Sequence, residues 1–241
     1  MTTREDLKKD FLEIVSSFKE YLSYLQGLDF EGPLREKLSD FSLERQSALA
    51  ETTGTEDKAT SLEAIRKQIG ECQRCPLGSS RKNLVFGAGN PHARLVFVGE
   101  APGRDEDLQG KPFVGKAGQL LTRIINAIGL DRKDVYIANI LKCRPPENRN
   151  PLPEEIVACE PFLIKQLEVI KPQIVVALGT FAAQTLLKTT EAISRLRGRF
   201  HLYQGIKLMP TYHPAYLLRN PQKKREVWED MQLVQEEFQQ S

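Results

Sequence analysis

Short apolar runs alternate with helical patterns along the chain after residue 90. Four runs rich in β-branched and aromatic residues predict strands at 94–100, 134–141, 173–179 and 207–214. Between them, apolar residues recur every three or four positions at 117–129 and 153–170, a shorter helix follows Thr180, and Asn220 and Pro221 begin a last helix. Strands that alternate with helices predict an α/β domain with a four-stranded parallel sheet covered by helices on both faces.

The N-terminal quarter follows a different pattern. In residues 3–27 the apolar positions form a narrow stripe that predicts a helix, and residues 46–60 are small and polar, as in a linker. We therefore expect a helical extension at 1–45, a linker at 46–60 and a second domain at 61–241. The stripe at 3–27 can pack on the rest of the protein, pair with a second copy, or dock on another protein.

Composition and charge indicate the class of protein, its location and the type of partner. The chain has 241 residues, 40% hydrophobic and 27% charged, as expected of a globular protein with a core. No apolar run approaches the roughly 20 residues of a membrane span, and the charged N-terminus lacks a signal-peptide core, so we expect a cytoplasmic protein with no membrane partner. The net charge of +2 combines an acidic segment at 1–60 with a basic remainder, which is mild evidence for a polyanionic partner.

The chain has four cysteines, Cys72, Cys75, Cys143 and Cys159, which in a cytoplasmic protein favour a metal site or reactive thiols over disulfides. Cys72 and Cys75 form a tight chelating pair, and the other two would join the start of the domain to its middle. Zinc and an iron–sulfur cluster both accept four thiolates, and spacing alone does not choose between them. The alternative is that Cys159 lies in the core and the tight pair stays unliganded.

Three polar side chains stand at or near the carboxyl ends of the predicted strands. Glu100 ends the first strand, Asn139 lies near the end of the second, and His213 ends the fourth. Carboxyl ends of parallel strands meet at one edge of the sheet, where ligands bind. Phe113 belongs to the glycine- and proline-rich stretch that follows the first strand. Each residue alone has a structural explanation, but together they indicate a site at this edge.

Five ordered motifs carry a resemblance to a known family. The segments GEAPGRDED, GKPFVGKAGQLL, ANILKCRPPENRNP, LGTFAAQTLL and PTYHPAYLLRNP, with four interleaved cysteines, resemble the iron–sulfur (family 4) uracil-DNA glycosylases over about residues 65–238. The resemblance implies a three-layer α/β/α domain with a short parallel sheet. It implies hydrolysis of the bond between uracil and deoxyribose in DNA, and a 4Fe-4S cluster held by the four cysteines as a structural or DNA-orienting group.

The resemblance also implies roles at the site. The flipped uracil would stack on Phe113, and Asn139 would read its edge, rejecting cytosine. His213 would donate a hydrogen bond to O2 as negative charge grows there, and Glu100 would stabilise the sugar cation, position water, or both. Glu106 stands where a thymine methyl would lie, so we expect Glu106→Ala to leave uracil excision largely intact. Backbone groups at 101–104, including Ala101 and Gly103, complete the substrate site, and Asp105 and Asp107 are expected to be solvated or capping charges.

The residues expected to bind DNA lie in segments near the last strand. Leu217 or Leu218 can wedge into the gap that the flipped base leaves, although packing under the last helix is the alternative. Arg219 and the run at 195–199, with Arg197 and Arg199, can meet phosphates. One relative traps itself on DNA through a histidine between the third and fourth cysteines. Residues 144–158 contain no histidine, so we expect turnover.

Two other functions stay open on the sequence. The first is a non-catalytic nucleic-acid-binding module with zinc at the four cysteines, which would be colourless. The second is a glycosylase for another deaminated base such as hypoxanthine, against which the uracil-matching amide of Asn139 argues.

Overall fold

The computed structural model describes residues 58–240. The chain divides into two units, 1–55 and 56–241, and the described residues belong to the second. The expected helical extension at 1–45 and its stripe at 3–27 therefore lie outside the described residues. The first described helix, α3 (Lys58–Ile69), begins within the stretch interpreted as a linker.

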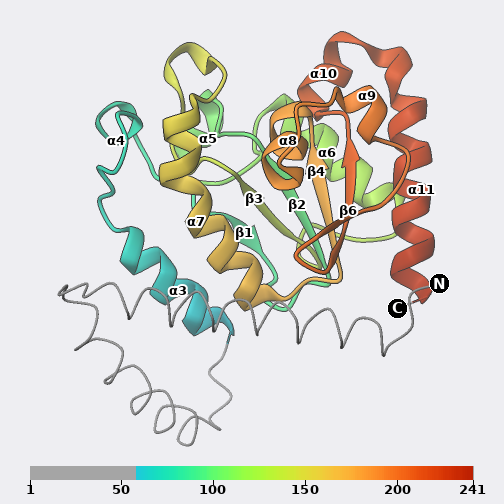
Figure 1. Ribbon diagram of the computed structural model, residues 1–241, viewed down its shortest axis with the longest axis horizontal. Helices are drawn as coiled ribbons and strands as arrows, with labels where there is room; N and C mark the ends of the chain where they lie inside the picture. The colour runs from blue at the N-terminus through green and yellow to red at the C-terminus, as the bar shows by residue number, and fades with distance from the viewer. Residues whose placement is uncertain (1–57, 241) are drawn as a thin grey trace, which may run out of the picture. The chain divides into compact units, whose positions relative to one another are not determined.

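The strands form one mixed sheet in the order β1-β3-β2-β4-β6-β5 (Figure 1). Its four central strands are parallel, and they match the four expected strands: β2 (Leu95–Gly99), β3 (Tyr136–Asn139), β4 (Ile174–Leu178) and β6 (Ile206–Thr211). Two antiparallel edge strands, β1 (Ala88–Gly89) and β5 (His201–Tyr203), correct the expectation of a four-stranded, purely parallel sheet. They have two and three residues, too few for a readable alternation of apolar and polar positions.

The longer helices lie close to their expected positions. These are α6 (Lys116–Ala127), α7 (Pro153–Ile170), α8 (Thr180–Leu187) and α11 (Lys224–Gln240), which follows the 3₁₀ turn η2 (Pro221–Lys223). The sequence patterns did not indicate the shorter elements α4 (Leu77–Ser80), α5 (Arg104–Gln109), η1 (Pro146–Asn148), α9 (Ile193–Leu196) and α10 (Pro214–Arg219). None of the short helices exceeds six residues, so none carries a full two turns of amphipathic pattern.

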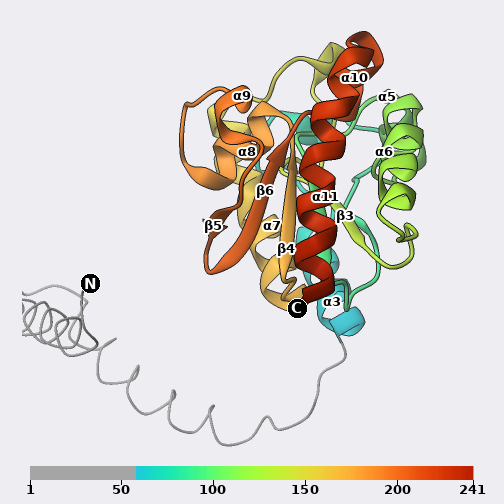
Figure 2. The same ribbon diagram turned by 90° about the vertical axis from the view of Figure 1, so that its right-hand side faces the viewer.

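Helices cover both faces of the sheet (Figures 1 and 2). All five residues of β2 are buried, and successive side chains point to opposite faces. Val96 and Val98 pack in a core with α3, α7 and α8, whereas Leu95 and Phe97 pack in a second core with α6 and α11. The result is a three-layer arrangement in which the sheet is buried on both sides, as parallel sheets require. No helix in the described part of the chain is long and apolar enough to cross a membrane.

Candidate active site and four-cysteine site

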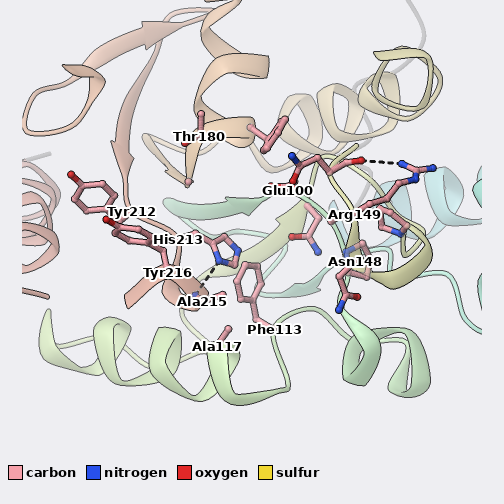
Figure 3. Close-up of a pocket in the computed structure, with 18 of the residues that line it drawn as sticks. Glu100, Phe113, Ala117, Asn148, Arg149, Thr180, Tyr212, His213, Ala215 and Tyr216 are labelled. Carbon is pink, nitrogen blue, oxygen red and sulfur yellow. Dashed lines mark hydrogen bonds between the residues drawn. The ribbon is translucent and has the colours of Figure 1, made fainter. Parts of the chain in front are cut away.

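A cavity of about 680 Å³ opens at the carboxyl ends of the central strands (Figure 3). Glu100 directly follows β2, Asn139 is the last residue of β3, and His213 follows β6 by two residues. All three line the cavity, together with Phe113. Residues far apart in sequence are therefore brought to one edge of the sheet, as the strand pattern predicts.

Asn139 has an oxygen without a partner. Its side chain is 1% exposed, and Oδ1 accepts no hydrogen bond from any described residue. Gly99 pairs with Asn139 across the sheet, and a Cβ at Gly99 would lie 2.4 Å from that oxygen and 2.6 Å from Cζ of Phe113. Only glycine at position 99 allows the amide and the ring to approach each other. A buried unpaired acceptor costs stability, so it indicates a ligand that would satisfy it.

Phe113 lies on a turn with an unusual backbone. Its φ of 51° is in the left-handed region, its side chain is 6% exposed, and its ring centroid lies 5.6 Å from that of His213 (Figure 3). Glu106 fastens the next residues, because its Oε1 accepts hydrogen bonds from the Val114 and Gly115 N–H groups at 2.8 and 3.0 Å. Glu106 also lines the cavity. Through these two hydrogen bonds Glu106 holds the turn that carries Phe113, a role that the sequence did not indicate.

His213 is held as one neutral tautomer. The backbone N–H of Ala215 donates to its Nδ1 at 3.1 Å, at the start of α10 (Figure 3). Burial lowers the pKa of His213 to about 4, with a further decrease from Arg219, opposed by Glu106. At neutral pH the ring is uncharged, and because Nδ1 accepts, the proton resides on Nε2. His213 can therefore donate one hydrogen bond from Nε2.

Glu100 stands in a place that disfavours its charge. Burial raises the pKa of its carboxyl from 4.5 to about 7. Ala101 and Gly103 follow it along the cavity wall, and Gly103 is the residue before α5. A carboxyl with a raised pKa in a cavity is a frequent mark of a functional group.

The four cysteines meet at a second place. Cys72, Cys75, Cys143 and Cys159 all line one small enclosed cavity between α4, α7 and the segment after β3. Among the described residues, no three cysteine, histidine or acidic groups lie close enough to bind a single ion. A zinc ion at about 2.3 Å from each sulfur would need the sulfurs about 4 Å apart. The four described thiols therefore line one cavity without being arranged around a single ion.

Donors surround these thiols. Arg74 Nη1 lies 3.2 Å from Sγ of Cys72, and the Lys142 N–H donates to Sγ of Cys159 at the same distance. Arg81 Nη1 lies 3.5 Å from Sγ of Cys143. Burial raises the pKa of Cys143 to about 11, and Arg81 opposes this increase. Positive charges and N–H donors stabilise thiolates, which are the form that binds metals.

The candidate DNA-contacting residues separate in the structure. Leu218 is 43% exposed, whereas Leu217 is 1% exposed and packs in the core, so only Leu218 is placed to reach another molecule. Arg219 lines the cavity and, like Arg199, is exposed. Arg197 is instead paired with buried Asp230, at 2.7 Å from Nη2 to Oδ1, and this pair joins α9 to α11.

Several residues that line the cavity were not predicted from the sequence as site residues. They come from the loop before α7, from α8 and from α10: Asn148, Arg149, Thr180 and Tyr216 (Figure 3). Arg149 is anchored by the buried carboxylate of Glu155, with 2.6 Å between Nη2 and Oε1. For Asn148 and Arg149, the prolines of the segment RPPENRNP are the local sequence feature that predicts a rigid loop. They do not indicate which face of the protein that loop covers.

The chain is similar to known proteins. Residues 86–232 match the family model described as the uracil DNA glycosylase superfamily. A type-4 uracil-DNA glycosylase from Archaeoglobus fulgidus is 47% identical over 184 residues, which cover 73% of this chain and 92% of the relative. The type-4 enzyme of Saccharolobus solfataricus is 47% identical, covering 73% of this chain and 85% of the relative, and that of Thermotoga maritima is 46% identical, covering 71% and 91%. The chain therefore belongs to the uracil-DNA glycosylase superfamily and, within it, to the type-4 family.

Proposed function

We propose that this protein flips uracil out of DNA and hydrolyses its N-glycosidic bond, leaving free uracil and an abasic site for base excision repair. The observation that carries the proposal is the cavity in which the unpartnered oxygen of Asn139 and the donor of His213 face one space. Membership in the type-4 family supports the reaction class. The substrate is uracil-containing DNA, in single or double strands.

Asn139 recognises the base edge in this proposal. Its Oδ1, which lacks a partner among the described residues, accepts a hydrogen bond from uracil N3–H, and its amide N–H donates to O4. Cytosine presents the opposite pattern at these two atoms, so it would leave buried groups facing like partners. A site built this way rejects the wrong analogue by about 10⁴-fold or more. Glu106, at the cavity wall, is the candidate for excluding the methyl of thymine.

His213 and Glu100 divide the charge that develops as the bond breaks. The base gains negative charge, and Nε2–H of neutral His213 donates to O2. The sugar gains positive charge, and the ionised carboxylate of Glu100 stabilises it, positions the attacking water, or does both. Phe113 provides the flat surface on which the flipped ring stacks. Ala101 and Gly103 supply backbone N–H groups beside the base.

We infer that the four cysteines hold a 4Fe-4S cluster. The support is the similarity to the type-4 family, the convergence of the four cysteines on one cavity, and the arginine donors near two of the sulfurs. When bound, the cluster would supply a cross-link among the segments at 72–75, 143 and 159. Hydrolysis of a glycosidic bond transfers no net electrons, so the proposed role is structural or DNA-orienting.

The DNA would lie across the mouth of the cavity. Leu218 fills the gap left by the base, and Arg219 and Arg199 meet phosphates. Leu217 and Arg197 support these residues from within, through the core and the Asp230 ion pair. A cytoplasmic location suits this role, and residues 3–27 are a candidate surface for a protein partner or self-association.

Oligonucleotides carrying uracil, hypoxanthine or thymine, followed by alkaline cleavage of abasic sites, test the proposal. Strand cleavage with uracil alone is expected. Cleavage with hypoxanthine only would favour the second glycosylase, and no cleavage by protein without absorbance at about 400 nm would favour a zinc module. Since residues 144–158 contain no histidine, no adduct with uracil DNA should survive denaturing electrophoresis.

A further inference from the structure

Phe113 forms a wall between two hollows. On one side lies the cavity of about 680 Å³ that holds Asn139 and His213. On the other side lies a second hollow of about 570 Å³, which Phe113 lines together with Pro112, Gly118, Thr122 and Arg132. The Phe113 ring is 6% exposed and packs in the core with α6 and α11, while the turn that carries it is open to the second hollow.

Polar groups also hold the turn on both flanks. After Phe113, the Glu106 carboxylate accepts the N–H groups of Val114 and Gly115. Before it, the guanidinium of Arg132 donates to the carbonyls of Pro112 and Phe113, from Nη2 at 3.0 Å and from Nη1 at 3.1 Å. The φ of 51° at Phe113 is a strained conformation for an aromatic residue, so it persists only where its surroundings enforce it.

The hydrogen-bond acceptors of Arg132 are uncharged carbonyl and hydroxyl oxygens rather than a carboxylate. The guanidinium also donates to the hydroxyl of Thr122, at 3.3 Å from Nη1, and this hydroxyl donates in turn to the Gly118 carbonyl on α6. Half-burial lowers the pKa of Arg132, yet the group stays cationic at neutral pH. A charge-assisted hydrogen bond is stronger than a neutral one, so two such bonds form a firm tether to adjacent carbonyls.

We propose that Arg132 is a positioning residue that holds the 112–115 turn so that the Phe113 ring stands ready for the flipped base. Arg132 does not touch the substrate; it acts through Phe113. The inference rests on the proposed function, because the ring needs a base to stack on. Glu106 completes the clamp from the other flank, so Glu106→Ala is also expected to slow uracil excision, contrary to the expectation from sequence.

Arg132→Met removes the tether and keeps much of the side-chain volume. We expect single-turnover excision of uracil from a single-stranded oligonucleotide to fall about 10- to 100-fold, the loss of one base–aromatic stack. Affinity for the oligonucleotide should change little, because phosphate contacts are untouched. In a Phe113→Ala background the same change should cost less than about 2-fold, because the ring that Arg132 positions is absent. A general structural role would instead cost the same in both backgrounds.

Arg123→Met is the matched control, since Arg123 is an exposed arginine on the neighbouring helix α6. It should excise uracil at the wild-type rate. Arg132→Lys, whose ammonium can reach one of the carbonyls, should retain an intermediate rate, and it replaces Arg132→Met in the cycle if the methionine variant does not fold. Equal rates for Arg132→Met and Arg123→Met, or equal losses with and without the Phe113 ring, would overturn the inference. A wild-type protein inactive on uracil would overturn the proposed function instead.

Discussion

The base pocket and the four-cysteine site are joined by one short segment, residues 139–143, yet they are built in opposite ways. The pocket keeps polar groups unsatisfied: the Oδ1 of Asn139 has no partner within the described chain, and burial opposes the charge of Glu100. At the cysteine site, donors from Arg74, Arg81 and Lys142 are directed at the sulfurs. The pocket thus keeps a buried acceptor free for a ligand, whereas at the cysteine site nearby donors oppose the cost of burying the thiols. Substitutions should separate activity from stability accordingly.

Asn139→Leu gives the largest expected separation. Leucine has a similar size but leaves uracil N3–H and O4 unpaired, so single-turnover excision should fall about 10³- to 10⁴-fold. The same change removes a buried acceptor without a partner, so the free energy of unfolding should rise by about 1 kcal/mol. Urea denaturation and excision assays on one preparation measure both. A loss of stability together with activity would contradict the view that the pocket is strained for function.

His213→Asn tests the donor on the opposite wall. Asparagine can still accept the Ala215 N–H at the start of α10, so the melting temperature should stay near that of the wild type. Excision should slow about 10²- to 10³-fold, the usual cost of removing one donor to a developing oxyanion. A rate within a few-fold of the wild type would show that His213 does not carry the charge of the base.

The pH profile should report Glu100 rather than His213. With pKa values of about 7 and about 4, only Glu100 titrates between pH 5 and 8. The ionised carboxylate is the active form, so the rate should fall about tenfold per pH unit below pH 7 and level off above it. A pH-independent rate between 5 and 8 would show that the Glu100 carboxyl does not titrate in this range.

The ionisation of Glu100 should lower the stability of the fold as pH rises, whereas it should raise the excision rate. A carboxyl whose folded pKa is raised destabilises the fold once pH exceeds its unfolded value of 4.5, and the penalty grows until pH is about 7. Glu100→Gln should therefore match the wild type near pH 4.5 and exceed it by about 1–2 kcal/mol at pH 8, allowing for screening of a partly exposed group. Thermal unfolding at several pH values measures the difference.

Cys159→Ala has the smallest expected effect on activity and a large one on stability. On the proposed 4Fe-4S site, the variant should lose absorbance at about 400 nm and melt at a lower temperature, because the proposed cross-link to α7 is removed. Molecules that remain folded should excise uracil within a few-fold of the wild-type rate. Val157→Ala, at a 73% exposed position on the same helix, is the control and should keep colour and melting temperature. Complete inactivity of folded Cys159→Ala would show that the two sites are coupled.

Strand ends were the most predictable part of the site. Glu100, Asn139 and His213 follow apolar runs, and the parallel arrangement of those runs dictates that they meet. Asp107 illustrates the limit: expected as a solvated or capping charge, it is 3% exposed and accepts the Lys82 and Asn83 N–H groups. These two partners precede Asp107 by more than 20 residues in the sequence, so no local sequence pattern could indicate them. The edge strands β1 and β5 escaped prediction because each is too short to show a period.

The sequence by itself determined the order of the four central strands and the longer helices, and the placement of Glu100, Asn139 and His213 at one edge of the sheet. These follow from residue type and from periods of 2 and 3.6, which are local properties of the chain. Tertiary structure alone decided which leucine is exposed, that Arg197 pairs with Asp230, and that Arg132 and Glu106 grip the turn of Phe113. Such contacts depend on where distant segments pack, and the free energy of that packing is a property of the whole fold rather than of any stretch within it.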